Sequence, residues 1–131
     1  MTRARAVTGI TLPDLLILVV ALALLLAVVV PEMSALRRRS LERAMREELQ
    51  RLATAEDSYF YDHRVYSADP AQLHAVGFRP SLGVQVVVRE ATAAGWSATT
   101  ARAGTPVQCA LFVRQAAPVG AARTPGETAC R

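Results

Sequence analysis

Hydrophobic and polar positions divide the chain into an apolar N-terminal part and a mixed remainder. Residues 15–30 read LLILVVALALLLAVVV without interruption, and the wider segment 10–30 contains one charged side chain, Asp14. In an α-helix, about 20 apolar residues span the hydrocarbon core of a bilayer. The pattern therefore predicts a hydrophobic transmembrane helix over residues 10–31.

Beyond this segment the pattern changes to that of an amphipathic helix. Apolar residues recur at spacings of three, four and seven, at Leu41, Met45, Leu49, Leu52 and Tyr59. Arginines and glutamates fill the remaining positions, and we expect them to face solvent. We predict one helix over residues 10–61, apolar on all sides in its first half and packed on a sheet in its second half.

The second half of the chain predicts strands and turns. Residues 62–83 contain two prolines and two glycines and are expected to form a connecting loop. Three segments predict an antiparallel meander, because they are rich in β-branched residues or alternate apolar with polar residues. These segments are 84–91, 95–102 and 107–114, and a tail rich in proline and glycine follows them. The predicted fold class is α+β.

A short basic leader, MTRARAVTG, precedes the apolar segment. A secretory signal peptide has its cleavage site of small residues after the apolar run, and no such site follows Val30 here. We therefore predict that residues 1–9 are removed by a cut between Gly9 and Ile10. Residues 32–131 then form a globular domain in the periplasm or outside the cell.

Pro13 and Asp14 fit a helix that begins near residue 10. Backbone N–H groups in the first helical turn have no partner, so the donor missing at Pro13 costs little there. In a helix continuing back through Gly9, the same proline costs about 3 kcal/mol. A carboxylate inside a bilayer is unfavourable by roughly 3 kcal/mol, which predicts a functional role for Asp14. The alternative, compatible with the first, is a capping box between Thr11 and Asp14.

The segment GITLPDLLILVV resembles the start of type IV prepilins and pseudopilins. Their signature is a glycine, an apolar residue, Thr-Leu, one further residue and an acid. Gly9 matches the residue before the cleavage point, Ile10 the new N-terminus and Asp14 the acid, while Pro31 matches a proline of the family's long helix. The sequence departs from the family in having Ile instead of Phe or Met after the cut, proline at position 13, and Asp instead of Glu.

The resemblance implies the type IV pilin fold. In this fold a long N-terminal helix, transmembrane in its first half, packs on a small antiparallel sheet of three to four strands. It also implies cleavage after Gly9 by a prepilin peptidase and N-methylation at Ile10. During assembly, Asp14 is expected to pair with the amino group of Ile10 on a neighbouring subunit, and Pro31 to permit local melting of the helix.

The function implied is that of a structural subunit of a type IV pilus. Its partners are other pilin subunits, the prepilin peptidase, the inner-membrane pilus assembly machinery and membrane lipid. The protein is expected first in the inner membrane, as a single-pass protein, and then in an extracellular or periplasmic filament. One alternative is a minor pilin or pseudopilin of a type II secretion or competence system. Another is an uncleaved single-span membrane protein with a small sensor or binding domain.

Three consecutive arginines conflict with this topology. Arg37, Arg38 and Arg39 follow the apolar segment closely and outnumber the two arginines of the leader. Taken alone, the positive-inside rule places the C-terminal domain in the cytoplasm. The leader signature and the cysteine pair favour export, and we expect export.

Cys109 and Cys130 are the two cysteines of the chain. An even number of cysteines in a membrane-targeted chain predicts a disulfide in an exported domain. The alternative is a pair of unpaired, buried thiols.

The candidate chemistry of the remaining residues is sparse. His63 beside Asp62 is a weak metal or base pair, and His74 is the second histidine. The chain has no catalytic or phosphate-binding sequence motif, so we expect no enzymatic activity, no cofactor and no metal site. A calcium site, as in major type II secretion pseudopilins, is not expected because Glu127 is the only acidic residue after Cys109.

The net charge of +4 is mild, and all 15 basic residues are arginines. Residues 62–131 contain seven arginines and four acidic residues. DNA is therefore a weaker candidate partner, through Arg102, Arg114 and Arg123, with a merely solvated basic surface as the alternative.

Overall fold

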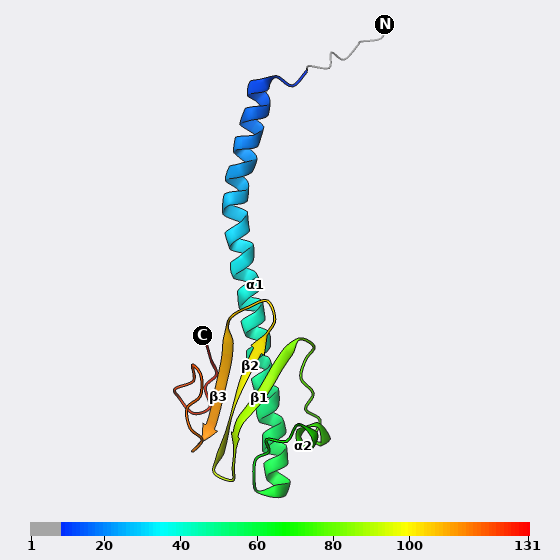
Figure 1. Cartoon of the computed structure of the whole chain (residues 1–131), viewed down its shortest axis with the longest axis vertical. Helices are drawn as coiled ribbons and strands as arrows, with labels where there is room; N and C mark the ends of the chain where they lie inside the picture. Colours follow the sequence, from blue (N-terminus) through cyan, green and yellow to red (C-terminus); the bar gives the residue numbers. More distant parts are fainter. Residues whose placement is uncertain (1–8) are drawn as a thin grey trace. The chain divides into compact units, whose positions relative to one another are not determined.

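The computed structural model describes residues 9–131, which contain two helices and four strands (Figure 1). The helices are α1 (Leu12–His63) and α2 (Pro70–Ala75), and the strands are β1 (Val84–Ala91), β2 (Gly95–Arg102), β3 (Gln108–Arg114) and β4 (Ala129–Cys130). The chain divides into two compact units, with the boundary between Arg37 and Arg38. The α+β class, with a long N-terminal helix and a small antiparallel sheet, is confirmed.

The four strands form one antiparallel sheet in the order β1-β2-β3-β4. The first two strands have the predicted bounds. The third begins at Gln108 instead of Val107, because the Val107 N–H donates to Thr105 Oγ1 at 3.2 Å and so belongs to the preceding turn. The tail adds the short strand β4, which pairs Cys130 with Cys109 and Ala129 with Ala110.

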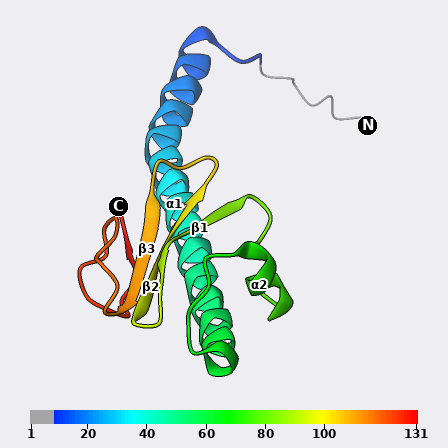
Figure 2. The ribbon, with the colours of Figure 1, turned by 60° about the horizontal axis from the view of Figure 1, so that its bottom comes forward.

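The inner face of the sheet packs on the C-terminal half of α1, as both ribbon views show (Figures 1 and 2). The apolar stripe predicted for this half is confirmed, with Met45, Leu49 and Leu52 fully buried. Alternate residues of the strands face it, because side chains in a strand point to opposite sides in turn. Burying such a side chain stabilises the fold by about 1.5–3 kcal/mol. The strand residues of this core are Val84, Trp96, Ala98, Cys109 and Leu111.

The outer face of β3 has a second, smaller core. Ala110 and Phe112 point away from α1 and are buried with Ala116 and Ala122 of the tail. The tail therefore covers the sheet from the side opposite α1, and β3 is buried on both faces.

The turn between β1 and β2 requires glycine at position 95. A Cβ atom on Gly95 would lie 2.4 Å from the carbonyl oxygen of Val113 and 2.6 Å from the amide nitrogen of Ala116. Both are backbone atoms, which cannot move aside cheaply. The absence of a side chain lets the β1–β2 turn and the end of β3 approach closely.

The connecting segment 62–83 contains a short helix that the sequence analysis missed. Helix α2 begins after Asp69, whose Oδ1 accepts a hydrogen bond from Ala71 N at 2.8 Å, and Pro70 occupies its first turn. An N-cap aspartate followed by proline is a typical helix start. In both ribbon views α2 lies beside β1, on the side away from β2.

Candidate functional site

The residues around the predicted cleavage point lie in exposed, non-helical backbone immediately before α1. Gly9 and Ile10 have no regular secondary structure, and Ile10 is 78% exposed. A Cβ atom added to Gly9 would meet no other atom within 4 Å. The peptide bond between them is therefore accessible in this structure. The rest of the predicted leader, residues 1–8, lies outside the described residues.

Asp14 caps the first turn of α1. Its Oδ2 accepts hydrogen bonds from Thr11 N at 3.2 Å and from Thr11 Oγ1 at 2.6 Å. One of the two bonds of the predicted capping box is thus present, from Thr11 N to the Asp14 carboxylate, while the Thr11 hydroxyl donates to that carboxylate instead of accepting from the Asp14 amide. Pro13 lies in the first helical turn, as expected. Both hydrogen bonds from Thr11 end on Oδ2. A carboxylate can accept hydrogen bonds at both of its oxygens, so Oδ1 can accept a further one.

The apolar half of α1 has no packing partner among the described residues. Its large hydrophobic side chains from Leu12 to Leu36 are all exposed. The helix is continuous through Pro31, and Ser34 Oγ donates to the Pro31 carbonyl at 2.7 Å. Within residues 9–131, α1 is the one helix long and apolar enough to cross a membrane.

The disulfide predicted between Cys109 and Cys130 is present. It joins residues directly opposite each other on β3 and β4. The backbone of the next pair is also joined, since Gln108 and Arg131 exchange two hydrogen bonds of 2.9 Å. The bridge therefore fastens the end of the tail to the sheet.

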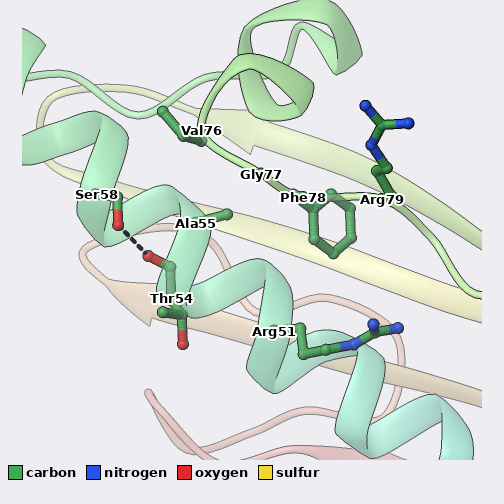
Figure 3. A pocket seen from close by; sticks show the side chains of 8 residues that line it. All are labelled: Arg51, Thr54, Ala55, Ser58, Val76, Gly77, Phe78 and Arg79. Atoms are coloured by element: carbon green, nitrogen blue, oxygen red, sulfur yellow. Dashed lines mark hydrogen bonds between the residues drawn. The ribbon is translucent and has the colours of Figure 1, made fainter.

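A pocket of about 330 Å³ lies between α1 and the segment after α2, and the sequence analysis did not predict it (Figure 3). In Figure 3, Arg51, Thr54 and Ser58 belong to α1, and Phe78 and Arg79 to the opposite wall. The hydroxyl of Ser58 donates to the Thr54 carbonyl at 3.0 Å. The lining offers two guanidinium groups and two hydroxyls but no carboxylate, imidazole or thiol. The charge of Arg51 is already paired with the Glu48 carboxylate, which among the described residues leaves Arg79 as the unpaired guanidinium of the lining. Such a lining suits a weakly anionic or hydroxyl-rich ligand and supplies no general base or metal ligand.

The guanidinium of Arg51 is held in place by two neighbours. It donates to Glu48 Oε2 and, at 2.5 Å, to Ser81 Oγ. The amide of Ser81 donates to the same carboxylate oxygen at 3.2 Å. Glu48 is buried, so the expectation that glutamates of this half face solvent is wrong at this position. A buried carboxylate needs such partners. Arg51 and Ser81 supply them at Oε2, whereas the buried Oε1 accepts no hydrogen bond from the described residues.

Glu56 is the second buried glutamate and corrects the same expectation. It is 0% exposed, and its Oε2 accepts a hydrogen bond from Ser67 N at 2.9 Å. Burial raises the pKa of Glu56 to about 7, because the charged form loses hydration. Burial likewise raises the pKa of Tyr66. Glu56 thus fastens the segment after α1 to the helix through a group that titrates near neutral pH.

The two histidines have separate surroundings. His63 stacks on Tyr59 with ring centroids 4.0 Å apart, and its Nδ1 donates to the Tyr59 carbonyl at 3.0 Å. His74 lies on α2 and lines a smaller pocket of about 150 Å³. In the described part of the chain, no three His, Cys, Asp or Glu residues are grouped so that they could hold a metal ion.

Two of the arginines considered for DNA are engaged within the domain. The guanidinium of Arg114 lies 4.7 Å from the centre of the Phe60 ring and 5.6 Å from that of Tyr66. Arg123 donates to the carbonyls of Gly120 and Ala122 at 3.0 and 2.9 Å. A cation–π contact such as that of Arg114 stabilises the local fold by about 0.5–1 kcal/mol at an exposed site. These contacts give both arginines a structural role.

The chain was also compared with known proteins. No protein-family model matches it, and a search of curated proteins finds no match.

Proposed function

We propose that this chain is a pilin-like structural subunit that enters the membrane through the apolar half of α1. A prepilin peptidase would hydrolyse the Gly9–Ile10 peptide bond, leaving a carboxylate on Gly9 and an amino group on Ile10. Transfer of a methyl group to that amine and polymerisation of the mature chain would follow. The main support is the arrangement of Gly9 and Ile10 directly before an apolar helix and of Asp14 in its first turn, in a segment whose side chains contact no other described part of the chain.

The unpartnered apolar surface accounts for both stages of this life cycle. Each of its leucines, when moved out of water, stabilises the buried state by about 1.5–3 kcal/mol. In the membrane, lipid would cover these apolar side chains. In a filament, the same half of α1 from neighbouring subunits would cover them. The disulfide-closed domain, which has its own core, would then lie outside the bundle.

Asp14 would pair with the Ile10 amino group of an adjoining subunit. Opposite charges attract strongly where the surroundings have a low dielectric constant. An isolated charge in the same place is unfavourable. The Thr11 capping bonds orient the carboxylate through one oxygen. The pair would then set the axial register between subunits.

The N-terminus of the mature protein tests the proposal. Mass spectrometry of protein from its native cells is expected to find a chain that begins at methylated Ile10. Gly9→Leu should leave the chain uncut, because the residue before the cleavage point matches the family's glycine. A native chain that still begins at Met1 would contradict the proposal.

The role of Asp14 has its own test, the yield of sheared filaments. Asp14→Ala should abolish filaments, whereas Thr11→Ala removes the capping hydroxyl but leaves the charge and should reduce the yield little. Equal losses in the two variants would assign Asp14 to capping alone. Abundance in those filaments would also separate a main subunit from a minor pilin or pseudopilin.

A second candidate is an uncleaved single-span membrane protein with a small binding domain. The observation that favours it is the pocket beside Arg51 and Arg79. An intact Met1, together with binding of an anionic ligand that Arg79→Gln weakens, would support this function over the first.

A further inference from the structure

Arg37, Arg38 and Arg39 lie where the apolar half of α1 ends, and the proposed function gives them no role. All three are exposed, as is Arg43 one turn later. In residues 9–131 the one ion pair that any of the three makes is between Arg38 and Glu42, at 3.1 Å. Arg37 and Arg39 therefore have no neutralising partner in the described part of the chain.

The three arginines project from more than one side of the helix. An α-helix has 3.6 residues per turn, so three consecutive side chains spread over more than half of its circumference. Residue 37 lies four positions before Leu41, and residue 38 lies seven positions before Met45. At these spacings the apolar stripe of the helix would continue. Because arginines occupy these positions, the apolar stripe does not extend beyond Leu41 toward the N-terminus, and the helix is charged on more than one side there. We call Arg37, Arg38 and Arg39 the arginine ring.

The position of the arginine ring matches the depth of lipid phosphates. Arg37 lies seven positions after Val30, the last residue of the apolar run, which is a rise of about 10 Å at 1.5 Å per residue. The headgroup layer of a bilayer is roughly 5–8 Å thick on each side. Helical side chains lean toward the N-terminus, which here is the direction of the apolar run. Long arginine side chains also reach along apolar surface to place their charge in a polar layer.

We propose that the arginine ring binds the phosphate groups of anionic phospholipids at the membrane surface next to the apolar half of α1. A guanidinium donates two parallel hydrogen bonds to phosphate and stays charged at all physiological pH values. The proposal rests on membrane insertion of residues 10–31, which is part of the proposed function, and not on cleavage or filament assembly. A membrane is favoured over nucleic acid, because the attached apolar segment places the ring at a lipid surface.

The test uses the full-length chain in nanodiscs made from equal parts of phosphatidylglycerol and phosphatidylcholine. Native mass spectrometry of the released protein then counts the retained lipids of each class. We expect phosphatidylglycerol to be enriched over its share in the bilayer. Each basic residue near an anionic surface contributes a factor of roughly five in association. The triple variant R37Q/R38Q/R39Q should therefore lose the enrichment.

Two control variants identify the interaction. The triple variant R64Q/R89Q/R131Q removes the same charge from exposed arginines of the globular domain and should keep the enrichment. R37K/R38K/R39K retains the charge and should keep most of it. High salt should reduce the enrichment, because it screens exposed charges. Free glycerol phosphate in excess should compete poorly, since it lacks the attachment that insertion gives the lipid.

Three outcomes would overturn the proposal. One is equal retention of the two lipids by the unaltered chain. Another is an equal loss in both glutamine variants. The third is a lower self-association of R37Q/R38Q/R39Q without any change in lipid, which would assign the ring to acidic groups of a second copy. Flotation with vesicles of the same lipid composition separates these results from a failure of the proposed function, in which the chain would not insert at all.

Discussion

Leu24 and Leu49 lie on the same helix and have the same side chain, but Leu24 is 65% exposed and Leu49 is 0% exposed. Around Leu49 the helix is apolar on one side only, and the sheet covers that side. Around Leu24 it is apolar on every side, and no described element covers it. The same residue type therefore stabilises the domain in one half and, by our proposal, holds the subunit in lipid or in a filament in the other. The surrounding pattern, more than the residue itself, separates the two roles.

The comparison is tested most strongly by the matched substitutions Leu49→Ala and Leu24→Ala. Leu49→Ala leaves a cavity in the core and should lower the free energy of unfolding by roughly 2–5 kcal/mol. Leu24→Ala should leave the domain's unfolding unchanged. Urea titration of the full chain in detergent, followed by the fluorescence of the buried Trp96, measures both. Similar losses in the two variants would mean that the halves of α1 are not energetically distinct.

The disulfide gives the next largest expected effect and also belongs to the domain. Replacing Cys109 and Cys130 by serine should lower the free energy of unfolding by about 3 kcal/mol, because the closed loop restricts the unfolded chain. Membrane insertion through the first half of α1 should not change. Urea titration and flotation of the same protein check the two statements. A variant that unfolds normally but no longer inserts would contradict the separation of the halves.

Glu56 makes the stability of the second half depend on pH. Its pKa is about 7 in the folded domain, above the ordinary value of 4.5, so the folded state holds the proton more tightly. Tighter proton binding by Glu56 stabilises the folded state; this stabilisation is complete below pH 4.5 and is lost as pH rises to about 7. Between pH 4.5 and pH 7, the free energy of unfolding of Glu56→Gln should therefore rise by about 3 kcal/mol relative to that of the unaltered chain.

Urea titrations at pH 4.5 and pH 8 measure this difference for Glu56→Gln. The exposed Glu47, changed to glutamine, is the matched control and should follow the unaltered chain. Parallel pH profiles for Glu56→Gln and the unaltered chain would show that Glu56 does not titrate differently on folding.

The smallest effect is expected near the border between the halves, at the ion pair of Arg38 and Glu42. This pair is exposed and follows the helical i, i+4 spacing. Arg38→Gln should change the free energy of unfolding by less than about 0.5 kcal/mol. A loss of more than 1 kcal/mol would show that the packed part of α1 extends further toward the N-terminus than its buried residues indicate.

Much of the fold could be predicted because it depends on periodic patterns. The apolar run and the stripe of Met45, Leu49 and Leu52 repeat over several turns, and the strands are rich in β-branched residues or alternate apolar with polar ones. Helix α2 was missed because six residues are too few to show a period. Its start signal, Asp69 followed by Pro70, was present, but the nearby glycines and prolines favoured a loop.

The site could be predicted only where its residues are close in sequence. Thr11 and Asp14 form a local capping motif, and the cysteines form the one possible pair. Glu48 and Glu56 were expected in solvent. Arg51 is only three positions from Glu48, but the backbone amides that donate to the two buried carboxylates come from residues farther along the chain. Ser81 is 33 residues from Glu48 and Ser67 is 11 residues from Glu56. Long-range partners of this kind leave no periodic signal.

The bridge between Cys109 and Cys130 also has a mechanical consequence. Tension applied along the chain must pass through the covalent link, because it joins two residues separated by 21 positions. A stretched chain extends by roughly 3.4 Å per residue, so about 70 Å of contour length is withheld from any pull. Under load, the tail and the outer core beneath it would behave as an inextensible segment.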